Sequence, residues 1–292
     1  MKSLKYFAPS ELIINPDGSV FHLHVKPEQL ADRIVLVGDP ARVTTVASYF
    51  DEQECEVQNR EFHTITGSYR GKRISVVSHG IGPDNIEIVL NELDALANID
   101  FATRTVHPQF RQLTMVRIGT SGGLQPNTPV GTFVATEKSI GFNGVLYFYA
   151  QSERVRDLAL EQALREQLDW QIEGLSPYVV SSDPALLEQI AGTDMVRGLT
   201  IAAEGFYAPQ GRVLRLPLAD PMLNQKIEAF AYEGHRITNF EMESSAVAGL
   251  AALMGHRALT VCYIIADRLN RKMNTDYKSS LPALIEQVLD RI

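Results

Sequence analysis

The chain has 292 residues, of which 45% are hydrophobic and 21% are charged, and this composition is typical of a globular protein. Its net charge is −8 and its basic residues are scattered, which argues against the basic patch of a nucleic-acid-binding domain. No stretch approaches the roughly 18 apolar residues of a membrane span, and residues 1–15 lack the apolar core of a signal peptide. We therefore expect a cytoplasmic protein that binds neither nucleic acid nor membrane.

The two cysteines, Cys55 and Cys262, lack metal-ligand spacing and fit a reducing compartment, where buried thiols behave as small hydrophobic residues. No linker, repeat or low-complexity segment interrupts the chain. We therefore expect one domain over residues 1–292, with a large core.

Apolar runs that end in glycine or polar residues predict buried strands, and segments of helical periodicity lie between them. In chain order, the expected strands cover residues 33–38, 61–69, 73–78, 114–119, 129–136, 178–182, 197–203 and 259–266. The expected helices cover residues 43–50, 85–96, 154–170, 246–254 and 281–292, with a turn at 39–42 and a hairpin at 70–71. This alternation predicts an α/β/α layered fold around a largely central sheet, with ligand-binding residues beyond the strand ends.

Two strand ends suit an anion. Gly38 would let an oxyanion approach the backbone amide, and the guanidinium of Arg42 could reach the same anion. Arg117 lies inside an apolar strand, where a cation needs a partner, and Thr120 and the following glycines offer a hydroxyl and free amides. The simpler alternatives are a tight turn with a solvent-exposed arginine at the first place, and an internal salt bridge followed by a flexible turn at the second.

The segment 206–212 suits a flat heterocycle. Phe206 could stack on the ring, Gln210 could bind an amide-like ring edge, and Arg212 could donate to a ring carbonyl. An ordinary loop rich in proline and glycine is the alternative. Asp267 and Arg268 directly follow the last apolar strand, where an exposed salt-bridging pair is the alternative to a ligand contact.

A pair of acidic residues stands at the start of the apolar helix at 246–254. Glu241 and Glu243 flank Met242, and a buried carboxylate is costly unless something binds it. This arrangement favours a ligand rich in hydroxyl groups, such as a sugar. Acidic residues that simply stabilise a helix N-terminus are the alternative.

Two further segments are unremarkable in isolation. Arg60 and Glu61 indicate a solvated charge pair, and His22 and His24 make no convincing metal site without further ligands.

Taken together and in this order, these segments resemble the nucleoside phosphorylase-I family, and within it the uridine phosphorylases. The similar segments cover residues 20–23, 37–42, 60–62, 80–82, 117–122, 206–212 and 241–244. The resemblance implies a three-layer α/β/α fold with a mixed, partly barrel-like central sheet. It also implies pyrimidine salvage by reversible phosphorolysis of uridine, with inorganic phosphate as co-substrate and without a cofactor.

The resemblance implies a role for each residue of these segments. Phosphate would be bound by Gly38, Arg42, Arg117, Thr120 and, from a neighbouring subunit, Arg60. Ribose would be bound by Glu241, Met242, Glu243 and the neighbour's His22, and the base by Phe206, Gln210, Arg212, Asp267 and Arg268. Arg117, Glu243 and Arg212 would be the catalytic residues. Because two groups come from another chain, a homo-oligomer is expected, either a dimer or a trimer of dimers.

Three features qualify the resemblance. Residues 1–19 are expected to be an N-terminal extension, and residues 100–113 an insertion that could alter the subunit interface. Asp267 stands where a uridine phosphorylase would have asparagine, which keeps purine nucleosides open as substrates. Some family members hold a monovalent cation between subunits, and Glu61, the carbonyl of Ile81 and Asn85 occupy the corresponding positions.

Three alternatives to a uridine phosphorylase stay open at this point. The first two are a purine nucleoside phosphorylase and a nucleoside hydrolase of the same superfamily. A hydrolase needs no phosphate, so three arginines suited to phosphate argue against it. The third is a non-catalytic nucleoside-binding protein on the same fold.

Overall fold

The computed structural model describes residues 5–270, 272–274 and 276–292. The strands are β1 (Arg33–Val37), β2 (Glu52–Asn59), β3 (Phe62–Tyr69), β4 (Lys72–Ser78), β5 (Ile99–Asp100), β6 (Thr105–Val106), β7 (Thr114–Gly123), β8 (Phe133–Phe142), β9 (Tyr178–Ser181), β10 (Val196–Ala203), β11 (Ile237–Glu241), β12 (Arg257–Asp267) and β13 (Lys272–Met273). The helices are α1 (Pro40–Ala47), α2 (Pro83–Asn98), α3 (Leu158–Gln167), α4 (Pro184–Ala191), α5 (Leu223–Ala229), α6 (Ser244–Met254) and α7 (Leu281–Arg291).

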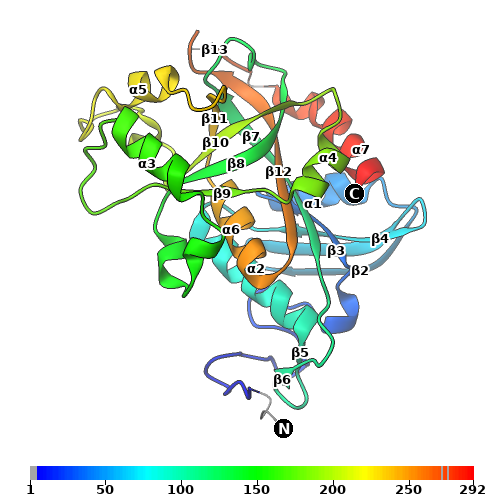
Figure 1. Ribbon diagram of the computed structural model, residues 1–292. Helices are drawn as coiled ribbons and strands as arrows, with labels where there is room; N and C mark the ends of the chain where they lie inside the picture. Colours follow the sequence, from blue (N-terminus) through cyan, green and yellow to red (C-terminus); the bar gives the residue numbers. More distant parts are fainter. Residues whose placement is uncertain (1–4, 271, 275) are drawn as a thin grey trace.

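A closed barrel stands at the centre of the mixed sheet (Figure 1). Its wall follows the order β12, β8, β10, β11 and β7, and it closes because β12 pairs with β7 in parallel. From β7 the sheet continues outward through β1, β4, β3 and β2. The three-layer fold with a partly barrel-like mixed sheet, expected from the resemblance, is therefore confirmed.

Helices cover the sheet on separate sides (Figure 1). α2 and α6 pack on each other and share one apolar cluster, to which Leu90 and Val247 belong. A second cluster contains apolar residues of α1, α4 and α7, such as Val46, Ile190 and Leu284. None of the helices in the described residues combines the length and apolar character that a bilayer crossing requires.

Several element boundaries differ from those expected. α1 begins at Pro40 rather than Val43, because Asp39 caps it by accepting from the Ala41 amide at 2.9 Å and proline suits the first helical position. The expected turn at 39–42 is thus the first turn of the helix. The strand expected at 129–136 runs over Phe133–Phe142 instead, and the helix expected at 154–170 is confined to Leu158–Gln167.

The first strand of the hairpin is β3, and its turn lies at Arg70 and Gly71 as expected, with φ values of 47° and 77°. Residues 100–113 contain β6, which pairs with β5, and the ring of Phe110 stacks on His256 at 5.4 Å. Tyr6, within the expected N-terminal extension, bridges to Thr105 of this segment.

Gly141 of β8 gives a first test of the packing between β8 and β9. The ring of buried Tyr178 lies where a Cβ at Gly141 would be, and its hydroxyl donates to Asn143 at 2.8 Å. Because this ring is fixed at both ends, Gly141→Ala should lower the free energy of unfolding by about 1–3 kcal/mol in urea titrations. Gly144→Ala is the matched control, since its Cβ would meet nothing within 4 Å. Equal stability of both variants would contradict this account of the packing.

Candidate functional site

A cavity of about 590 Å³ opens at the carboxyl ends of β1, β7 and β12, where ligands bind in open α/β sheets. It collects residues that the sequence analysis assigned to three different parts of a ligand. Those assigned to phosphate are Gly38, Arg42, Arg117 and Thr120, and those assigned to ribose are Glu241, Met242 and Glu243. Those assigned to the base are Phe206, Gln210, Arg212, Asp267 and Arg268.

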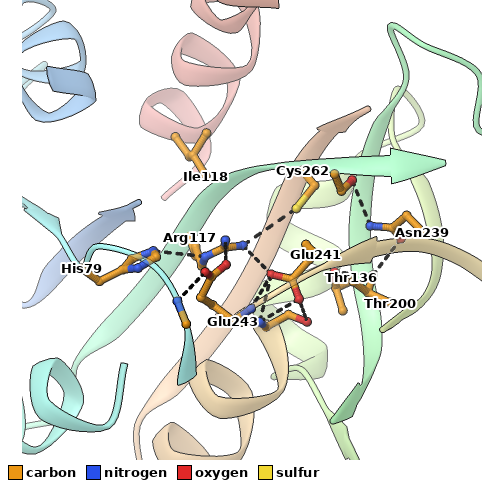
Figure 2. A network of polar contacts seen from close by, with 12 residues as sticks. His79, Arg117, Ile118, Thr136, Thr200, Asn239, Glu241, Glu243 and Cys262 are labelled. Atoms are coloured by element: carbon orange, nitrogen blue, oxygen red, sulfur yellow. Dashed lines mark hydrogen bonds and ion pairs between the residues drawn. The ribbon is translucent and has the colours of Figure 1, made fainter. Parts of the chain in front are cut away.

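Arg117 is the central cation of the cavity, and it is 4% exposed. Its Nη1 lies 2.9 Å from Oε2 of Glu241, and its Nη2 pairs with Oε2 of Glu243 (Figure 2). Burial alone would lower the pKa of Arg117, but the two carboxylates outweigh burial and raise it. The internal salt bridge considered in the sequence analysis therefore exists, and it connects two sets of residues that face one cavity.

Arg42 extends the same end of the cavity from α1. Its Nη1 donates to the carbonyl of Ile118 at 3.2 Å, which fixes the guanidinium beside the middle of β7. Burial, followed by the nearby charge of Arg117, lowers the pKa of Arg42. Two cations held this close favour an anion between them.

Glu241 holds the start of α6. Its Oε2 accepts from the amide of Glu243 at 2.9 Å, and its Oε1 accepts from the amide and hydroxyl of Ser244 at 2.9 and 2.6 Å. Together with Arg117, these donors occupy both carboxylate oxygens. The helix-stabilising alternative thus describes Glu241 well, although its side chain also borders the cavity.

Glu243 is buried but less fully engaged. Its Oε1 accepts from the amide of Gly82 at 2.9 Å, and its other oxygen pairs with Arg117. Burial raises the pKa of Glu243, and the Arg117 guanidinium acts in the opposite direction. Each oxygen has a lone pair left for a ligand hydroxyl.

At the far end of the cavity, two arginines hold Gln210, which is 3% exposed. Arg212 donates through Nη1 to Oε1 of Gln210 at 2.6 Å, and Arg268 donates through Nη2 to its backbone carbonyl at 2.7 Å. Burial, and then the charge of Arg268, lower the pKa of Arg212 to about 10. The guanidinium of Arg212 also lies 3.8 Å from the ring centre of Phe206, which is 48% exposed.

Asp267 turns toward its own loop rather than toward Arg268. Its Oδ1 accepts from the amide of Asn270 at 2.9 Å, and its Oδ2 accepts from the Asn270 side chain at 2.7 Å. These two hydrogen bonds lower the pKa of Asp267, so its carboxylate carries no proton near neutral pH.

Comparison of the chain with models of protein families shows which family it belongs to. The model of the phosphorylase superfamily matches residues 32–289, which is nearly the whole chain. The chain belongs to the phosphorylase superfamily. The family resemblance drawn from the sequence is therefore confirmed.

Known relatives of this superfamily member include enzymes with two base preferences. The uridine phosphorylase of Thermococcus kodakarensis is 29% identical over 274 residues, which cover 91% of this chain and 84% of the relative. A DeoD-type purine nucleoside phosphorylase from Aliivibrio fischeri is 25% identical over 246 residues, covering 83% and 84%. A Trypanosoma brucei nucleoside phosphorylase, described as showing uridine phosphorylase activity, superposes with a TM-score of 0.87 at 27% identity, covering 96% and 98%.

Four of the residues assigned to the phosphorylase site are only at its rim or outside it. His22 is 2.6 Å from Glu92 through Nδ1, and Arg60 is exposed at the β2–β3 turn without an ion pair to any described residue. Neither residue borders the cavity. Glu61 and Asn85 lie beside Gly80, next to the 71% exposed Ile81.

Three residues of the phosphorylase site were missed by the sequence analysis. His79 contacts Arg117, the Gly82 amide binds Glu243, and Cys262 accepts weakly from Arg117 at 3.9 Å. The run from Gly80 to Gly82 was noted, but its function as an amide donor could not be seen without knowing which strand it faces. Burial raises the pKa of Cys262 to about 12, so its thiol stays protonated near neutral pH.

Proposed function

We propose that the chain is a uridine phosphorylase, a pentosyltransferase that reversibly converts uridine and phosphate into uracil and ribose 1-phosphate. The observation that carries the proposal is the fixed amide of Gln210. Because Arg212 occupies one lone pair of Oε1, the other lone pair can accept from the ring N–H of uracil while Nε2 donates to a ring carbonyl. The guanidinium of Arg212 offers further donors to the second carbonyl. Phe206 would stack on the ring.

The mechanism needs no attack by a side chain. Phosphate, held by Gly38, Arg42, Arg117 and Thr120, attacks the anomeric carbon as the bond to uracil breaks, so that catalysis begins with positioning. The electron pair of the breaking bond goes to the uracil ring, where Arg212 and Arg268 stabilise the developing negative charge.

Glu243 acts on the sugar in this mechanism. Its carboxylate accepts from the ribose 2′- and 3′-hydroxyls and opposes the positive charge that develops on the ring, while Met242 packs against the sugar. Glu241 supports it from the start of α6. The chemistry is thus complete with phosphate as co-substrate and without an organic cofactor.

The charge balance favours a site shared between two copies of the chain. Arg42 and Arg117 are offset by Glu241 and Glu243, so the binding of a phosphate dianion calls for a further cation. Arg60 of a second copy would supply that cation, and His22 of the same copy would bond the 5′-hydroxyl. A monomer in light scattering under assay conditions would contradict this arrangement.

A monovalent cation would be held at the same interface by Glu61, the Ile81 carbonyl and Asn85. Oxygen ligands of this kind suit a hard cation. Activity that is the same in potassium and in tetramethylammonium buffers would argue against such a cation.

A purine nucleoside phosphorylase is the second candidate, and the observation that favours it is the presence of Asp267 at the cavity. A departing purine would need a proton from this side chain. Against this candidate, both oxygens of Asp267 accept hydrogen bonds from Asn270, and its lowered pKa leaves it ionised.

The proposed phosphorolysis of uridine also belongs in the cytoplasm, where nucleosides are recycled.

One assay separates these functions. The protein is incubated with uridine, inosine or 5′-methylthioadenosine, with and without phosphate, and the free base is measured. We expect uracil release that depends on phosphate, at a rate at least about tenfold above base release from either purine nucleoside. Faster release from inosine would favour the purine enzyme. Release without phosphate would favour a hydrolase, and no release a binding protein.

A further inference from the structure

His79 is a buried histidine to which the mechanism above gives no task. It follows β4 directly, and its amide donates to the carbonyl of Val37 at 2.9 Å, which anchors it beside the loop that begins at Gly38. Its side chain is 0% exposed and does not border the cavity. Its Nε2 lies 3.2 Å from Nε of Arg117, on the side of the guanidinium away from Cys262 (Figure 2).

The N–H group at Nε of Arg117 determines which nitrogen of His79 carries the proton. Nε of arginine is a donor only and keeps its proton at any pH relevant to proteins. Nε2 of His79 therefore presents a lone pair, which leaves the ring neutral with its proton on Nδ1, and this Nδ1 is buried without a hydrogen-bond partner among the described residues. Burial, followed by the charge of Arg117, lowers the pKa of His79 well below its usual value, and the other charged group that acts on it in the same direction is Arg42.

The contacts of Arg117 then engage all three nitrogens of its guanidinium. Nη1 meets Glu241, Nη2 meets Glu243, and Nε meets His79. The two carboxylates alone would allow the plane to rock about the line that joins them. An acceptor at Nε removes that freedom and leaves the cavity-facing edge of the guanidinium in one orientation.

We propose that His79 is a positioning residue that orients Arg117 toward phosphate by acting as a hydrogen-bond acceptor for its Nε. The inference rests on the proposed function for the identity of the anion. It assigns His79 no contact with the substrate and no proton transfer. Its consequence is that phosphate binding, and not nucleoside binding, depends on the lone pair of this ring.

Two substitutions distinguish the effect of the Nε2 lone pair of His79 from the effect of the size of its ring. His79→Phe keeps an aromatic ring but has no acceptor, which leaves Nε of Arg117 buried without a partner. His79→Gln can offer an oxygen at the position of Nε2. Thr64→Val is the matched control, because it changes a buried side chain on the neighbouring strand β3 whose hydroxyl has no partner among the described residues.

The experiment measures binding and turnover separately. Calorimetry with inorganic phosphate alone gives the dissociation constant, and steady-state rates with uridine give KM for each substrate. His79→Phe should weaken phosphate binding by about tenfold or more, whereas His79→Gln and Thr64→Val should stay within about threefold of the unmodified chain. KM for uridine should change less than about threefold in all three variants.

Two results would overturn the proposal. One is unchanged phosphate binding in His79→Phe, and the other is equal loss in His79→Phe and His79→Gln. If His79→Phe does not fold, His79→Met, which is slimmer and lacks a strong acceptor, takes its place. Failure of the proposed function appears differently, as absence of uracil release from an unmodified chain that still binds phosphate.

Discussion

Replacing Arg117 by alanine should remove nearly all phosphorolysis, with a fall in kcat/KM for phosphate of about 10³-fold or more. The expected size follows from the loss of one charged donor that is held in a buried site and positions the attacking phosphate. Arg117→Lys should recover only part of this loss. A single ammonium group cannot reproduce the contacts that the three guanidinium nitrogens make with Glu241, Glu243 and His79. The measurement is initial rate against phosphate concentration at saturating uridine.

The same substitution should also cost stability. Removing the guanidinium leaves Glu241 and Glu243 buried without their shared cation, which typically costs about 3–5 kcal/mol. Urea unfolding of Arg117→Ala checks this value. Arg197→Ala is the matched control, because Arg197 pairs with Glu188 on the surface, where such a pair contributes about 1 kcal/mol or less. A rate near that of the unmodified chain at limiting phosphate would remove Arg117 from the phosphate site.

Replacing Glu241 and Glu243 in turn by glutamine should distinguish the roles of the two carboxylates. Glu243→Gln should lower kcat by about 10²-fold, because an amide cannot oppose the sugar cation and cannot accept from both the Gly82 amide and Arg117. Glu241→Gln should lower the rate less, by about tenfold. Its main effect should be a loss of about 1–3 kcal/mol in stability, since an amide cannot accept from all the donors at the start of α6.

Both variants are compared by kcat with saturating substrates and by urea unfolding. Each variant serves as the control for the other, because the two substitutions are chemically identical and lie two residues apart. A larger fall in kcat for Glu241→Gln than for Glu243→Gln would reverse the assignment of the sugar contact.

Much of the cavity could be predicted because its residues stand at strand ends. Gly38, Thr120 and Asp267 each lie at or near the carboxyl end of a strand, and those ends meet at one edge of the sheet. The apolar runs that form β1 and β12 are strong signals of buried strands. The order of the segments carried the family resemblance, and the resemblance supplied the expectation of a partly closed sheet.

Other features depend on contacts between distant residues and left no local signal. β11 contains Thr238 and Asn239, whose polarity hides a buried strand. Asn239 is tolerated there because it accepts from Thr200 at 2.9 Å and donates to Ser121 at 3.1 Å, in a network that Figure 2 shows in part. The contact of His79 with Arg117 likewise joins residues 38 positions apart.

The sequence also suggested a loop where β7 continues as a strand. Thr120 to Gly123 remain paired with β12, with one register shift between Ile264 and Ala266, and Gly122 and Gly123 also pair with β11. Glycines allow this crowding, since a Cβ at Gly123 would overlap the carbonyl of Thr128. A glycine-rich segment that looks flexible in isolation is thus part of the barrel wall.

The continuous strand β7 runs along the cavity and determines the spacing of residues that line it. Arg117 and Thr120 lie on the N-terminal side of this stretch, and Arg268 lies against Gly122, where a Cβ would meet its Cγ at 3.2 Å. Strands advance about 3.3 Å per residue, so Thr120 and Gly122 are about 7 Å apart along the strand. Since inserting one residue into a strand reverses every later side chain, the spacing between Thr120 and Arg268 in the cavity is set by backbone pairing as well as by side chains.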